Sequence, residues 1–176
     1  MIDARHYAVR DTLRDGTAIL IRALRPDDGP RLAEAFSQLE AESVFTRFFG
    51  SKAGLTEADY RLIREMDFDT KVALLVTTMV DGREIVIASC SYTRFAPGAA
   101  EVAFIVEEDY HGQGIASRLL QHLGLIARER GIVRFEAEVL AQNGAMLRVF
   151  ASAGWPMTPR REDGSIHIVL ALDAAG

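Results

Sequence analysis

Residues 101–120, EVAFIVEEDYHGQGIASRLL, decide the fold of this chain. The apolar run at 101–106 is typical of a buried strand, and it leads into a turn with glycines at 112 and 114. From Gly112 to about Arg130 the apolar side chains at 115, 119, 123 and 126 share one helix face, and Gly131 ends the helix. The first amides of a helix have no partner inside it, and with the helix dipole they form a seat for an anion, most often phosphate. The stretch therefore predicts a phosphate-bearing ligand held by main-chain amides.

Composition bounds the class of protein. A length of 176 residues, 49% of them hydrophobic, suits one domain with a full core. The formal net charge of −5 argues against a nucleic-acid partner, which needs a basic face. Cys90 is the only cysteine, so the chain has neither an internal disulfide nor a cysteine metal cluster, which fits a cytoplasmic location. No apolar run approaches the roughly 20 residues of a membrane span, and the charged start is not expected to be a signal peptide.

Hydrophobic periodicity and turn signals predict the other elements. Residues 1–16 are polar, and we expect them to be partly disordered and to precede a single domain at 17–173. Asp81-Gly82 is a hairpin turn signal, and Thr56 is a helix cap. The expected strands cover 18–24, 71–80, 83–93, 101–106, 133–140 and 165–172, and the expected helices begin at 26, 41, 56, 112 and 143.

The order of these elements predicts the architecture. A strand–helix–strand unit places the strands at 101–106 and 133–140 parallel and next to each other. The hairpin at 71–93 adds antiparallel strands. The fold class is therefore α/β, with a mixed, mostly antiparallel twisted sheet and helices on both of its faces.

The glycine turn has three interpretations. A plain strand-to-helix connection needs only one glycine, whereas two flank Gln113 here. A dinucleotide fingerprint would place a third glycine where Ser117 stands, and its acidic residue, Glu136, would fall in mid-strand. A P-loop is excluded because no Gly-Lys-Ser/Thr follows. The third interpretation is a family resemblance.

Two motifs carry that resemblance. His111-Gly112-Gln113-Gly114-Ile115-Ala116 resembles motif A of the GNAT superfamily of acyl-CoA N-acyltransferases, Gln/Arg-x-x-Gly-x-Gly/Ala, although histidine stands first. Asn143-x-x-Met146-x-x-x-Phe150-x-x-x-Gly154-Trp155 resembles the later Asn-x-x-Ala-x-x-x-Tyr-x-x-x-Gly-Phe segment of that family. The resemblance covers residues 18–172. Four earlier segments are similar to the acetyltransferase module of bacterial protein-lysine acetyltransferases: Asp15-Gly16-Thr17, Ile21-Arg22, Arg25-Pro26-Asp27-Asp28 and Thr46-Arg47-Phe48-Phe49.

The resemblance implies that acetyl-CoA is the co-substrate, with no metal. In the family the coenzyme's diphosphate lies on the amides of the glycine turn, and its pantetheine arm runs along the preceding strand. Asn143 is similar to an asparagine that reaches this arm, and it is also a helix cap on local grounds. The implied cofactor-binding residues are Phe104, Ile105, Val106, His111, Gly112, Gln113, Gly114, Ile115, Ala116, Ser117 and Asn143.

The resemblance also implies N-acyl transfer to a primary amine. The amine must be neutral to attack a thioester, and Glu101 resembles by position the strand glutamate that acts as general base in several members. Phe150 stands where the family has the tyrosine that protonates the leaving thiolate, so the general acid is unassigned. An exposed charge at a strand end is the simple alternative for Glu101.

Three functions remain compatible with the sequence. The first is an acetyl-CoA-dependent N-acetyltransferase whose acceptor is a small-molecule amine or a protein lysine. The second is a coenzyme A-binding sensor or interaction module without catalysis, which the missing tyrosine favours. The third is a dinucleotide-binding module. The sequence leaves the acceptor and the oligomeric state open, a homodimer included, and it predicts neither a nucleic-acid nor a membrane partner.

Overall fold

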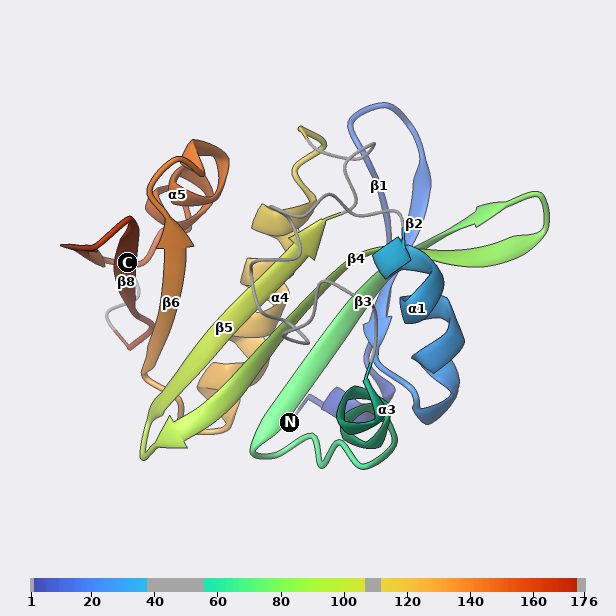
Figure 1. The fold of residues 1–176 in the computed structure, drawn as a ribbon, viewed down its shortest axis with the longest axis horizontal. Coiled ribbons are helices and arrows are strands. Elements are labelled where there is room, and N and C mark those ends of the chain that lie inside the picture. The colour runs from blue at the N-terminus through green and yellow to red at the C-terminus, as the bar shows by residue number, and fades with distance from the viewer. Residues whose placement is uncertain (1, 38–55, 107–111, 174–176) are drawn as a thin grey trace.

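The computed structural model describes residues 2–37, 56–106 and 112–173. Its centre is an eight-stranded sheet with the strand order β1-β2-β3-β4-β5-β6-β8-β7 (Figure 1). The strands are β1 (Ala8–Thr12), β2 (Ala18–Ala23), β3 (Lys71–Val80), β4 (Arg83–Ala96), β5 (Ala99–Val106), β6 (Arg134–Leu140), β7 (Met157–Glu162) and β8 (Ser165–Ala171). The helices are α1 (Gly29–Ser37), α3 (Glu57–Arg64), α4 (Ile115–Glu129) and α5 (Gly144–Ala151), with short 3-10 helices η1 (Ala4–His6) and η2 (Pro26–Asp28).

The predicted mixed, mostly antiparallel sheet is confirmed. Among the described strands only β5 and β6 pair in parallel, and they do so over three residue pairs that end at Glu101 and Glu136. Beyond that point the two strands diverge (Figure 1). The opposite edge of β6 stays paired with β8 along its whole length, from Arg134 to Leu140. The divergence therefore falls between β5 and β6.

Helices cover both faces of the sheet, as predicted. In Figure 1 α4 lies behind β4 and β5, whereas α1 and α3 lie on the viewer's side. The predicted apolar stripe of α4 is buried, with Leu119, Leu123 and Ile126 inaccessible to solvent. Gly124 lies on the same helix against Trp155, and a Cβ atom there would come within 2.3 Å of the indole. Trp155 is thus part of the core.

Two local predictions, the bounds of one strand and one helix cap, are confirmed to the residue. β3 has the predicted bounds, and Thr56 caps α3 by accepting a hydrogen bond from the Asp59 amide. Helix α4 begins at Ile115 rather than at Gly112, because Gly114 is its N-cap with a left-handed φ of 81°. The helix predicted at 41–49 lies outside the described residues.

The structure has a strand near each end of the chain that the sequence analysis did not predict, and the expected partial disorder of residues 1–16 is wrong where β1 forms. Within residues 1–16, β1 pairs along its full length with β2, so this polar segment adds a strand to the sheet instead of being disordered. Residues 157–162 form β7, which pairs with β8 across a hairpin turn that holds Asp163. The β7 side chains are mostly exposed at the sheet edge, so no apolar alternation signals a strand there.

A buried ion pair closes the bend between β2 and α1. Arg22 and Asp28 are 1% and 0% exposed, and the guanidinium donates two hydrogen bonds of 2.8 and 2.7 Å to the carboxylate. Glu84 on β4 accepts a third from Arg22 at 3.0 Å. Burial opposes ionisation of Asp28, but its bonds from Arg22 and from the Arg25 amide outweigh that effect and lower its pKa. The ion pair and its hydrogen bonds offset the free-energy cost of burying these charges.

We expect Asp28→Asn to lower the free energy of unfolding by about 3–5 kcal/mol, because it leaves the buried Arg22 charge without its bidentate partner. Urea denaturation followed by circular dichroism measures the change. Asp27→Asn is the matched control, since the Asp27 side chain is 72% exposed and its contact with Arg31 spans 3.8 Å. Equal stability of the two variants would contradict a structural role for the pair.

Candidate active site

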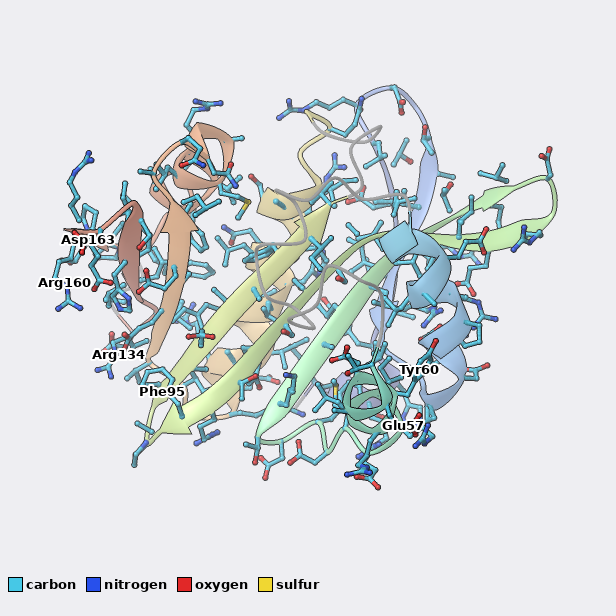
Figure 2. The ribbon with its side chains drawn as sticks, in the orientation of Figure 1. Glu57, Tyr60, Phe95, Arg134, Arg160 and Asp163 are labelled. Carbon is cyan, nitrogen blue, oxygen red and sulfur yellow. The ribbon has the colours of Figure 1, made fainter. Side chains whose placement is uncertain are left out.

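The divergence of β5 and β6 opens a cavity of about 680 Å³ between them. Its walls are the diverging strands, the start of α5 and the β7–β8 turn. We call it the acidic cavity, because its charged lining residues among those described are Glu101, Glu138, Glu162 and Asp163. Figure 2 shows Asp163 and Arg160 at the β7–β8 hairpin, at the far edge of the sheet from α1. Four carboxylates, with no lysine or arginine among the described lining residues, favour a cationic occupant.

A second cavity of about 470 Å³ lies where β5 leads to α4. We call it the basic cavity, because its charged lining residues in the described part of the chain are Arg14 and Arg148. Gly112, Gly114 and the first turn of α4 form one wall, and residues of α5 form another. This cavity favours an anionic occupant.

The two cavities are adjacent, since Phe104, Asn143 and Met146 line both. They form a single cleft along β5 with a cationic end near Val106 and an anionic end near Glu101. Five residues of extended strand separate those ends, a distance of roughly 17 Å at 3.3 Å per residue. A ligand that spans the cleft is long, with an anionic part at one end.

The glycine turn has the geometry of an anion site. Gly112 and Gly114 both have a left-handed φ of 81°, and a Cβ atom at Gly112 would meet no described protein atom within 4 Å. The N-cap of α4 is Gly114, which has no side chain to bond the amides of the first turn, so these keep the orientation that suits an anion. The open side of Gly112 leaves the approach clear.

The tip of the β1–β2 hairpin lies against this turn. Arg14 donates a hydrogen bond of 3.1 Å from Nη1 to the Gly112 carbonyl, and the Asp15 amide donates one of 3.2 Å to Gln113 Oε1. The sequence prediction missed Arg14 because it treated residues 1–16 as a polar segment. The Asp15-Gly16 pair is a hairpin turn signal, and it could have indicated a strand before it and placed Arg14 at the tip of a hairpin.

Glu101 lies at the point where β5 and β6 separate, and its side chain is exposed to the acidic cavity. Cross-strand pairing places Thr93 beside Glu101 and Lys71 beside Thr93, so the three side chains share one face of the sheet. Burial lowers the pKa of Lys71, and the charges of Glu101 and Asp59 oppose that shift. The candidate base therefore has a half-buried cation on its own face of the sheet, two strands away.

His167 bridges two carboxylates beside the acidic cavity. Its Nδ1 lies 2.6 Å from Glu138 Oε1, and its Nε2 lies 2.7 Å from Glu136 Oε1. Both ring nitrogens must carry a proton to donate both bonds. The hydrogen bonds to Glu138 and then to Glu136 raise the pKa of His167, although partial burial opposes them. Glu162 also approaches Glu138 and His167, so these three groups could hold a metal ion by position.

The predicted cofactor residues fall into one region. Phe104, Ile105, Val106, Gly112, Gly114, Ile115, Ala116, Ser117 and Asn143 line the basic cavity, and Gln113 lies between two of them. His111 lies outside the described residues. Asn143 caps α5 by accepting a 3.2 Å bond from the Met146 amide, as its local context predicted, and it also faces both cavities. Met146 of the second motif lines both cavities as well.

Phe150 lies on the side of α5 that lines the acidic cavity, and its ring has no hydroxyl group that could donate a proton. It is 1% exposed and meets Phe104 edge to face, with ring centroids 5.9 Å apart. This pair forms an apolar floor where the two cavities join.

Comparison with known proteins decides the family. Residues 36–155 match the sequence model of the Acetyltransferase (GNAT) family. The chain belongs to this family. The resemblance to acetyltransferases inferred from the two motifs is thus confirmed.

The chain is similar to several named acetyltransferases. It is 27% identical to Acetyltransferase PA5475 of Pseudomonas aeruginosa over 97% of this chain and 91% of that protein. It is 31% identical to Acetyltransferase Pat of Mycolicibacterium smegmatis over 81% of this chain, but it spans only 42% of that relative. The structure of the GNAT domain of S. lividans PAT matches with a TM-score of 0.80 and 35% identity, covering 93% of this chain and 96% of that domain.

None of the described helices is long and apolar enough to cross a membrane. The cytoplasmic location stays a prediction.

We expect the His167 ring to titrate above the ordinary histidine pKa of about 6.5, because Glu138 and Glu136 stabilise its protonated form. The stability that this network contributes is complete below that value and is lost as the pH rises through the raised pKa. NMR titration of the ring measures the midpoint, and Glu138→Gln should lower it. Glu57→Gln is the control, because Glu57 is an exposed residue of α3, far from β8 (Figure 1). A wild-type midpoint below 6.5 would refute the bridge.

Proposed function

We propose that this chain transfers the acetyl group of acetyl-CoA to a primary amine, with Glu101 as general base and a protein lysine as the acceptor. The observation that carries the proposal is the separation of charge along one cleft. The basic cavity suits the phosphates of the coenzyme, and the acidic cavity suits an amine that arrives protonated. The reacting atoms then meet between them, near Phe104 and Glu101.

The coenzyme fits the cleft by its chemistry. Its diphosphate would lie on the amides of the first turn of α4, at the open side of Gly112. Its pantetheine arm would follow Phe104, Ile105 and Val106 toward the acidic cavity, on the side of β5 that turns away from β4. The two amides of this arm can pair with an extended strand as a further strand would.

The amine needs a base at the junction. A lysine ammonium has a pKa of about 10.4 and is mostly protonated at pH 7, so one proton must leave before attack. Glu101, directly or through one water, accepts that proton. The amine nitrogen then attacks the thioester carbonyl carbon and forms the carbon–nitrogen bond of the amide. The carbon–sulfur bond breaks, the thiolate leaves, and the second nitrogen proton passes to the thiolate or to water. A thiol pKa near 8.5 makes this leaving group stable enough to depart without the phenol that Phe150 lacks.

The acceptor class rests on two supports. The carboxylates of Glu138, Glu162 and Asp163 surround the approach to Glu101 and attract a cationic side chain. The likeness of this chain to the S. lividans PAT domain, at 35% identity over nearly the whole domain, favours a protein lysine over a small amine.

A coenzyme A-binding module without catalysis is the second candidate. The observation in its favour is Phe150, which fills with an apolar ring the position of the expected acid. This candidate predicts binding of acetyl-CoA without turnover on lysine peptides. The two candidates therefore differ in one measurement, the release of free thiol when an amine is added.

We expect Glu101→Gln to lower kcat with acetyl-CoA and lysine peptides by about 10²–10⁴-fold, because the amide cannot accept the ammonium proton. A thiol-release assay measures the rate, and calorimetry should show acetyl-CoA binding within about twofold of wild type. Glu57→Gln on α3 is the matched control, since that side chain is 79% exposed and lies away from the acidic cavity (Figure 2).

Three outcomes distinguish the possibilities. A selective loss of kcat in Glu101→Gln supports the general base. Turnover that survives in this variant at the wild-type rate would exclude Glu101 as the base while leaving acetyl transfer intact. Binding of acetyl-CoA by the wild type with no thiol release from any lysine peptide or pooled amine favours the non-catalytic module.

A further inference from the structure

We propose that Arg14, at the tip of the β1–β2 hairpin, is a phosphate-binding residue of the basic cavity. The inference rests on the proposed function insofar as it takes coenzyme A as the ligand. It goes further in assigning a binding role to a segment outside both sequence motifs, 98 residues away from the glycine turn.

The first step is the position of the guanidinium. Its Nη1 donates a hydrogen bond of 3.1 Å to the Gly112 carbonyl. Its Nη2 and Nε lie 3.5 and 3.6 Å from the place where Gly114 would carry a Cβ atom. The planar group therefore lies against the turn that precedes α4, beside the amides of the first helical turn. An anion on those amides would lie within reach of the same side chain.

The second step concerns the N–H donors of Arg14 that the bond to Gly112 does not use. A guanidinium has five N–H donors in a rigid fork, and the bond to Gly112 uses one of them. The basic cavity has no acidic lining residue in the described part of the chain, so no carboxylate there competes for the others. The fork matches two oxygens of a phosphate group, which is the geometry that makes arginine a preferred phosphate partner.

The third step is the rigidity of the hairpin tip. Leu13 is buried, its amide donates 2.9 Å to the Thr17 carbonyl, and its carbonyl accepts 2.9 Å from Gly16. The Asp15 amide bonds to Gln113 on the glycine turn itself. Arg14 is thus held at its backbone before a ligand arrives, and little conformational freedom is lost when its side chain binds.

The competing explanation is that Arg14 only fastens the hairpin to the glycine turn. The two roles differ in what they recognise. A phosphate-binding role affects only ligands that carry phosphate, whereas a fastening role distorts the whole cleft. S-acetylpantetheine carries the thioester and the pantetheine arm without the diphosphate, so it separates the two roles.

The test compares wild type, Arg14→Gln, Arg14→Lys and Arg10→Gln. Calorimetry gives the Kd of coenzyme A, and thiol release gives KM and kcat with acetyl-CoA and with S-acetylpantetheine. Arg10→Gln is the matched control, because Arg10 is an exposed arginine on β1 that does not line the cavity. We expect Arg14→Gln to raise the Kd of coenzyme A and the KM of acetyl-CoA at least tenfold, the effect of one lost charge-assisted hydrogen bond. Its kcat/KM with S-acetylpantetheine should stay within twofold of wild type.

Arg14→Lys keeps the charge and loses the fork, so its KM should fall between those of the wild type and Arg14→Gln. Equal losses with both thioesters, or a Kd for coenzyme A equal to that of Arg10→Gln, would overturn the assignment of Arg14 alone. If the wild type binds no coenzyme A at millimolar concentration, the proposed function fails and the assignment fails with it.

Discussion

The parallel pairing of β5 with β6 ends after three residue pairs, at Glu101 and Glu136, and the cleft depends on this one constraint. Beyond that point β6 is paired with β8 alone, as far as Leu140. β5 in turn is paired with β4 from Ala99 to Val106. With both outer edges held, the separation between the two strands has a fixed position and direction. The chemistry is then arranged along the inner edges of two rigid strands.

The two ends of the cleft carry opposite charges, in the order that the proposed ligands need. The cationic end combines main-chain amides of α4 with Arg14 and Arg148, and the anionic end gathers carboxylates from β5, β6 and the β7–β8 turn. The cavities meet at apolar and amide side chains, Phe104, Met146 and Asn143, which carry no charge. The proposed coenzyme, with phosphates at one end and an uncharged thioester at the other, would meet a complementary potential along the cleft. The carboxylates at the opposite end would attract the ammonium group of the proposed acceptor.

Local signals predicted the elements that bury an apolar face. β3 and the buried stripe of α4 follow from hydrophobic spacing, and the cap at Thr56 follows from a single side chain and its neighbour three residues on. The same reasoning failed for β1 and β7, whose outward residues Arg10 and Arg160 lie in strands at the two edges of the sheet. An edge strand made of polar residues is held by main-chain hydrogen bonds, which leave no pattern in the side chains.

The sequence alone determined the strand, the glycine turn and the helix at 101–130, and with them the family; the anion site on this turn is its prediction. These depend on residues close together in the chain, where φ preferences and amide geometry act locally. Only the tertiary structure decided that Arg14 lies on that turn, that His167 joins Glu136 to Glu138, and that Lys71 shares a face with Glu101. Those contacts depend on which strands are neighbours in the sheet, and no local stretch of the sequence specifies that order.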